Sequence, residues 1–174
     1  MDWTLTILKL IDLQTFTSFW YWLVVIVTWS IAGNWLIGVP FDILMRARKC
    51  PPQELADLEA IVEINVRRIV WTSHLFGIAM VALIAFFLCM LATMSFVYRI
   101  ELAQGLLMLC APMTIVVMIN FLLAFQLHAA PLQGRDLVRR LFVVRLWVQI
   151  VAMISLFLSA IYGMYFAISS QHLF

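Results

Sequence analysis

The sequence has very little charge. Only 11% of its 174 residues are Asp, Glu, Lys or Arg, whereas 66% are hydrophobic, and its mean hydropathy is +1.06. A soluble domain is about half apolar and about a quarter charged. One small core cannot hide such a surplus, so lipid must be the solvent for most of the surface. The composition predicts a single membrane domain over residues 1–174, and a net charge of +2 gives no argument for a nucleic-acid partner.

Motifs for catalysis are missing as well. The chain contains no HExxH-like spacing, glycine-rich phosphate loop or nucleophile elbow. No carboxylate lies in the middle of an apolar run, which argues against an ion-coupled transporter. Cys50, Cys89 and Cys110 show no paired spacing, so we expect neither a disulfide framework nor a metal site. The N-terminus lacks the features of a signal peptide and is expected to stay in the mature protein. These absences favour a protein that is not an enzyme.

Four long apolar runs predict an all-α membrane protein, a bundle of four transmembrane helices. The runs cover about residues 16–39, 69–97, 102–127 and 141–168. Each is long enough to cross about 30 Å of hydrocarbon at about 1.5 Å per residue. Residues 1–15 carry apolar groups at helical spacing. They predict a short helix in the membrane interface, or a terminus that orders only against its neighbours.

Small residues recur at three-four spacing on two of these runs. Such stripes let helix backbones approach closely, so we expect one packing face on each run. The second run carries Ala82, Ala85, Cys89 and Ala92, and the fourth carries Ser155, Ser159, Gly163 and Ala167.

A polar arm, residues 50–68, precedes the second run. Pro51 and Pro52 make a good helix start, and no strong helix breaker follows before residue 97. We therefore expect the second span to extend into the cytoplasm as one long helix, whose arm projects roughly 20 Å from the membrane. Glu63 and Arg67 have the spacing of an i,i+4 ion pair. The arm's apolar stripe must rest on the membrane surface, on the second polar loop or on another subunit. The residues predicted to bind a partner are Glu54, Leu55, Asp57, Leu58, Ile61 and Val62.

Lys and Arg gather on two polar loops. The segment between the first two runs holds five of them, and the segment between the last two, with its flank, holds four. The other side has only Lys9 and Arg99. By the positive-inside rule, loops 40–68 and 128–140 face the cytoplasm, and both termini face the periplasm of a bacterial inner membrane.

Polar residues within or at the ends of the apolar runs are few and share a depth toward the cytoplasmic leaflet. Polar groups are costly in lipid, so each is a candidate for function. They either form interhelical hydrogen bonds or line a pocket for a quinone, a lipid or haem. His74 and His128 carry the haem alternative, because paired imidazoles from two spans can ligate iron. The candidate pocket residues are Asn34, His74, Asn120, His128, Arg145 and Gln149.

Several short motifs resemble those of a known family. They are the MDW start, FWYW at 19–22, GVPFD at 38–42 and an acidic arm leading into VRRI at 66–69. Together they resemble a small bacterial family of four-span integral membrane proteins, whose members are sometimes labelled components of the SufBCD complex. The resemblance covers most of the chain and implies a bacterial membrane protein, but it assigns no functional residue. Iron–sulfur clusters need several thiolates, which these cysteines do not supply.

The small size, the missing catalytic motifs and the abundant packing surface predict a non-catalytic accessory, assembly or scaffold subunit of a larger inner-membrane complex. Its partners would be the lipid bilayer and other membrane-protein subunits. The alternative is a quinone-, lipid- or haem-binding protein with a polar pocket in the cytoplasmic leaflet.

Overall fold

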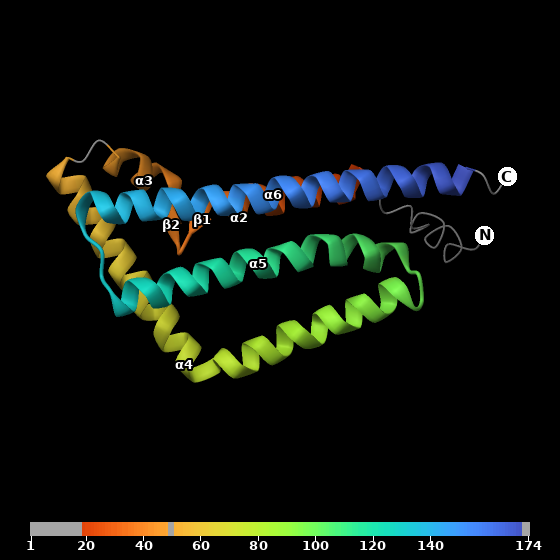
Figure 1. Cartoon of the computed structure of the whole chain (residues 1–174), viewed down its shortest axis with the longest axis horizontal. Helices are drawn as coiled ribbons and strands as arrows, with labels where there is room; N and C mark the ends of the chain where they lie inside the picture. Colours follow the sequence, from red (N-terminus) through yellow and green to blue (C-terminus); the bar gives the residue numbers. More distant parts are fainter. Residues whose placement is uncertain (1–18, 49–50, 172–174) are drawn as a thin grey trace, which may run out of the picture.

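Three long helices dominate the molecule (Figure 1). They are α4 (Pro52–Phe96), α5 (Glu101–Ala129) and α6 (Gly134–Gln171). Each is long and apolar enough to cross a membrane. α5 lies between α4 and α6 and contacts both. The predicted all-α membrane fold is confirmed at this level, and α6 begins seven residues before the predicted fourth span at 141.

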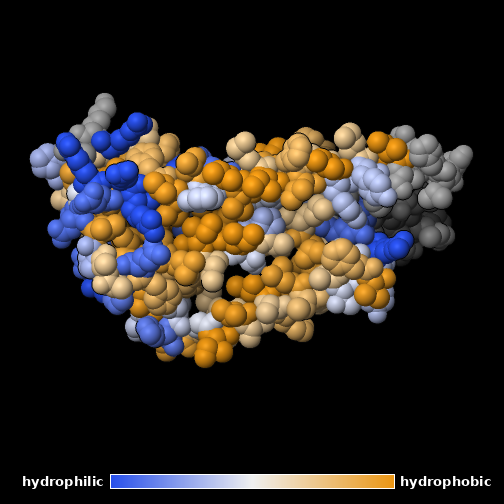
Figure 2. All heavy atoms as spheres, in the orientation of Figure 1, coloured by the Kyte–Doolittle hydropathy of each residue, from blue (hydrophilic) through white to orange (hydrophobic). Residues whose placement is uncertain are grey.

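The computed structural model describes residues 19–48 and 51–171. The predicted interfacial helix over residues 1–15 lies outside them. Figure 2 shows that hydrophilic residues gather at one end of the molecule, where α4 begins and α5 turns into α6. We call this the arm end.

The first apolar run forms a shorter helix than predicted. Helix α2 (Phe19–Asn34) has 16 residues and runs beside α6. At about 1.5 Å per residue it is roughly 24 Å long, less than the roughly 30 Å of bilayer hydrocarbon. The prediction of a continuous span to residue 39 is wrong, because the chain leaves the helix after Asn34 and forms a β-hairpin.

The hairpin pairs β1 (Trp35–Leu36) with β2 (Val39–Pro40). Its two turn residues both have positive φ, 51° at Ile37 and 72° at Gly38. Positive φ at both central residues is typical of the tight two-residue hairpin turn. Glycine adopts it freely, but a β-branched residue there is an outlier that costs about 1–2 kcal/mol. The surrounding structure must therefore hold the turn in place.

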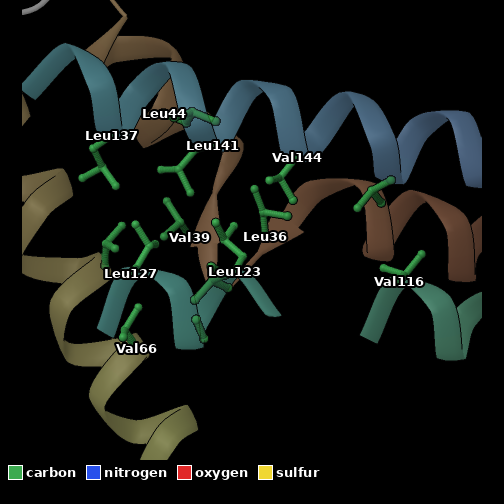
Figure 3. Packing of buried hydrophobic residues seen from close by; sticks show 14 of the residues in the cluster. Leu36, Val39, Leu44, Val66, Val116, Leu123, Leu127, Leu137, Leu141 and Val144 are labelled. Carbon is green, nitrogen blue, oxygen red and sulfur yellow. The ribbon is translucent and has the colours of Figure 1, made fainter. Parts of the chain in front are cut away.

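The hairpin fills the space between the helices near the arm end. Figure 3 shows Leu36 and Val39 between α6 and α5, and both side chains are buried. Helix α3 (Phe41–Ala47) follows directly and adds Leu44 to the same cluster. Neighbours in the cluster from the long helices include Val66, Leu123, Leu127, Leu141 and Val144.

Helix α4 begins at Pro52, as predicted, and continues to Phe96. It is not straight: it bends sharply, and its arm crosses the ends of α5 and α6 (Figure 1). The expectation of an arm that projects away from the membrane is therefore corrected. The arm's stripe is buried, at no more than 6% exposure, at Leu58, Val62, Val66 and Val70. Burying a Leu or Val that water would otherwise cover contributes about 1.5–3 kcal/mol, so folding back is favoured over projecting.

The two stripes of small residues have different surroundings. On α6, the prediction of a packing face is confirmed by the burial of Ser155, Ser159 and Gly163. On α4, Ala82, Ala85 and Cys89 are exposed, so no other helix among the described residues covers the stripe at these positions. In this half of α4 the buried residue is Ser95, which lies on a different side of the helix. Its carbonyl oxygen accepts a hydrogen bond from Gln104 Nε2 of α5 at 3.1 Å.

Substituting Gly38 should destabilise the protein, whereas substituting Gly33 should not. An added Cβ at Gly38 would lie 3.1 Å from Asn65 Nδ2 and would need φ +72°, but nothing lies within 4 Å of one at Gly33. We expect Gly38→Ala to lower the free energy of unfolding by about 1–2 kcal/mol. Gly33→Ala should leave it unchanged or raise it, because alanine is the better helix former. Thermal unfolding in detergent, followed by circular dichroism, compares the two variants. Equal effects would contradict the positive φ of Gly38 and its close approach to Asn65.

Candidate functional site

A cavity of about 440 Å³ opens at the arm end, between the arm and the turn that joins α5 to α6. We call it the arm pocket. Its apolar wall includes Val62 and Val66 from α4 and Leu127 from α5. Its polar groups are Glu59, Glu63 and Arg67 of the arm, His128 of α5 and Gln133 of the turn.

The spacing of residues on the arm explains the pocket's make-up. Glu59, Glu63 and Arg67 lie at i, i+4 and i+8, so they share one side of the helix. That side flanks the buried stripe of Val62 and Val66, so the charges border an apolar wall.

A hydrogen bond ties the arm to the start of α6. The backbone N–H of Gly134 donates to Glu59 Oε1 at 2.6 Å. Gly134 has φ +59°, which glycine adopts without strain. A carboxylate at a helix N-terminus also complements the helix dipole. This contact fixes the width of the pocket beside the α5–α6 turn.

Two opposite charges of the pocket do not neutralise each other. Glu63 and Arg67 were predicted to form an ion pair, but neither has an ion-pair partner within 4 Å among residues 19–48 and 51–171. By contrast, Arg46 pairs with Asp42 at 2.6 Å on α3. The arm pocket therefore presents a carboxylate and a guanidinium that are both able to bind a ligand.

Asn120 was predicted to line a ligand pocket, and it binds the hairpin instead. Its Oδ1 accepts a hydrogen bond from the backbone N–H of Ile37 at 3.0 Å, and its Nδ2 donates to the carbonyl oxygen of Val116 at 2.9 Å. Arg145 contacts Phe41, the first residue of α3, directly after the hairpin. Its guanidinium carbon lies 3.6 Å from the centre of the Phe41 ring, which is a cation–π contact. Two of the residues that the sequence assigned to a ligand thus bind the chain itself, Asn120 at the hairpin and Arg145 at the start of α3.

The other predicted pocket residues are dispersed. His128 lines the arm pocket, but His74 does not. Asn34, His74 and Gln149 are exposed. The structure thus brings only one of the six predicted residues, His128, to the arm pocket. His74 and His128 do not line this pocket together, so they do not form a pair of haem ligands there.

The residues predicted to bind a partner divide into two groups. Leu58 and Val62 are 0% and 5% exposed, so they are core residues of this chain rather than partner contacts. Leu55 and Ile61 are half-buried against the same core. Glu54 is half-buried and Asp57 is exposed. Of the three supports considered for the stripe, the segment predicted as the second polar loop is the one found, because Leu137 and Val138 belong to the same buried cluster. Leu123 and Leu127 of α5 complete that support.

Glu59, Glu63, Arg67 and Gln133 were not among the predicted site residues. The four-residue spacing of the first three places them on one side of a helix, and that side could have been predicted as a binding surface. An ion pair between Glu63 and Arg67 was predicted instead. No local pattern places Gln133 near the arm, because the contact depends on how the helices pack.

The arm pocket can hold a small molecule that has charges of both signs and an apolar part. No protein-family model, curated protein or solved structure matches the chain. The arm pocket and the exposed helix faces are therefore the features that indicate its function.

Replacing Asn120 with leucine should destabilise the protein much more than the same change at Gln149. Asn120→Leu keeps the number and branching of the side-chain heavy atoms but leaves the Ile37 N–H without its acceptor. Leaving such a buried donor unsatisfied costs about 1–3 kcal/mol. Gln149 is exposed, so Gln149→Leu should change the free energy of unfolding by less than about 0.5 kcal/mol. Denaturation of the two purified variants in detergent measures the difference, and an Asn120→Leu variant as stable as the parent would contradict this role.

Proposed function

We propose that the protein is a non-catalytic accessory, assembly or scaffold subunit of a larger membrane complex. In this proposal, α4 is the helix that engages a neighbouring subunit. The supporting observation is the exposure of α4: none of its most apolar stretch is buried, compared with 17% for α5 and 22% for α6.

The exposed side of α4 has the side chains of a packing face. Ala82, Ala85 and Cys89 follow one another along it and are exposed. Small side chains at such spacing let two helices approach closely in lipid, where dispersion contacts drive association. On α6 the corresponding stripe is buried, with Ser155 Oγ 3.4 Å from the carbonyl oxygen of Met108 on α5. The α4 stripe also consists of small residues, and at Ala82, Ala85 and Cys89 no helix among the described residues lies against it.

We further propose that α2 is a fourth span in a bacterial inner membrane, with both polar loops in the cytoplasm and both termini in the periplasm. The distribution of arginine supports this orientation. The arm and the α5–α6 turn lie at the same end of the molecule, and Figure 2 shows hydrophilic residues concentrated there.

Purification from native membranes in a mild detergent tests the accessory role. The parent protein should retain other membrane proteins in fixed stoichiometry. Ala85→Trp should reduce the retained partner about tenfold or more, because a bulky side chain that separates the helices costs about 1–3 kcal/mol. Met153→Trp on α6 is the matched control, since Met153 is 71% exposed and lies outside the stripe.

Two outcomes would contradict the proposal. A parent protein that purifies alone, as a monomer or as copies of itself, would exclude an accessory role. A partner that Ala85→Trp and Met153→Trp retain equally would exclude α4 as the contact.

A further inference from the structure

We propose that the arm pocket binds the head group of a phospholipid that carries a phosphate and a primary ammonium, as in phosphatidylethanolamine. The phosphate would lie toward Arg67 and His128, and the ammonium toward Glu63 and Glu59. This proposal does not depend on the accessory role, which rests on a different face of α4.

The pocket lies where a lipid head group would be found. Arg67 is in the last turn before the second apolar run, and His128 is in the last turn of α5. Both residues therefore lie where the long apolar helices give way to the arm end. Figure 2 shows the hydrophilic surface of that end. At such a boundary, basic side chains meet lipid phosphates.

The order of the charges matches the order of groups in the lipid. Going from the apolar part of α4 toward its start, the pocket offers Arg67, then Glu63, then Glu59. Going outward from its acyl chains, the lipid offers a phosphate and then an ammonium. Guanidinium and imidazole N–H groups donate to phosphate oxygens, and carboxylates accept from ammonium N–H groups. Val62, Val66 and Leu127 supply an apolar wall for the glycerol and the first methylenes.

Other amphiphiles fit these walls less well. Phosphatidylglycerol, an anionic lipid, has the same phosphate for Arg67 but no ammonium to pair with the two carboxylates. A choline head group has no N–H to donate and is held by aromatic rings, and no Phe, Tyr or Trp is among the described residues that line the pocket. A quinone has no charge to pair with Glu63 and Arg67.

Native mass spectrometry of the full chain, titrated in detergent with phosphatidylethanolamine, phosphatidylcholine and phosphatidylglycerol, tests the proposal. We expect one phosphatidylethanolamine to bind about tenfold more tightly than either other lipid. Glu63→Gln and Arg67→Gln should each weaken it about tenfold, because each removes one charge-assisted contact. Asp57→Asn and Arg68→Gln are the matched controls, since both residues are exposed on the arm and neither lines the pocket.

Several results would overturn the proposal. Equal affinity for the three lipids would show an unspecific amphiphile surface. Loss of binding in the control variants as large as in the pocket variants would show a general charge effect. Soluble phosphoethanolamine that displaces the lipid at equal concentration would assign the pocket to a free metabolite. The melting temperatures of Glu63→Gln and Arg67→Gln should equal that of the parent, which separates loss of binding from loss of fold.

Discussion

The hydrogen bond from the backbone N–H of Ile37 to Asn120 Oδ1 is the contact on which the packing of this molecule depends. Where lipid is the solvent, water does not reach the backbone, and irregular chain is tolerated only where protein groups satisfy it. The turn at Ile37 and Gly38 breaks helical hydrogen bonding and imposes positive φ on a β-branched residue. Helix α5 supplies the acceptor, Asn120 Oδ1, that stabilises this turn. Without that acceptor, the turn would leave the N–H of Ile37 unsatisfied, at a cost of about 1–3 kcal/mol.

The hairpin sets the arrangement of the arm end. Leu36 and Val39 fill the space between α5 and α6 near the arm end (Figure 3). Farther along, the same two helices contact each other directly, as at Ser155 and Met108. The arm closes this cluster from one side through Leu58 and its stripe, and the bond from Gly134 to Glu59 holds it there. The arm pocket is the space left between the arm and the α5–α6 turn. The hairpin therefore forms part of the core that the arm covers, and Val62, Val66 and Leu127 of that core also line the arm pocket.

Composition and apolar periodicity predict the long helices, because twenty or more apolar residues in succession require lipid and a helix in lipid satisfies its own backbone. They do not predict the hairpin. Residues 35–40 are as apolar as the helix before them, and the acceptor that stabilises the turn lies 83 residues later in the chain. The sequence also shows that Asn120 is a polar residue within an apolar run. It does not show whether the side chain binds a ligand or a backbone N–H. Likewise, the spacing of Glu63 and Arg67 permits an ion pair. That both residues line the arm pocket depends on how the arm packs against the α5–α6 turn, which the spacing does not predict.

Hydrogen–deuterium exchange of the full chain in detergent, read by mass spectrometry on peptides that cover residues 35–40, tests the buried hairpin most directly. The Ile37 amide is bonded inside the protein, so it should exchange as slowly as amides in the middle of α5. The amides of Leu132 and Gln133, in the exposed turn between α5 and α6, should exchange fast and serve as the reference. Exchange of the hairpin as fast as that turn would contradict a buried hairpin held by Asn120.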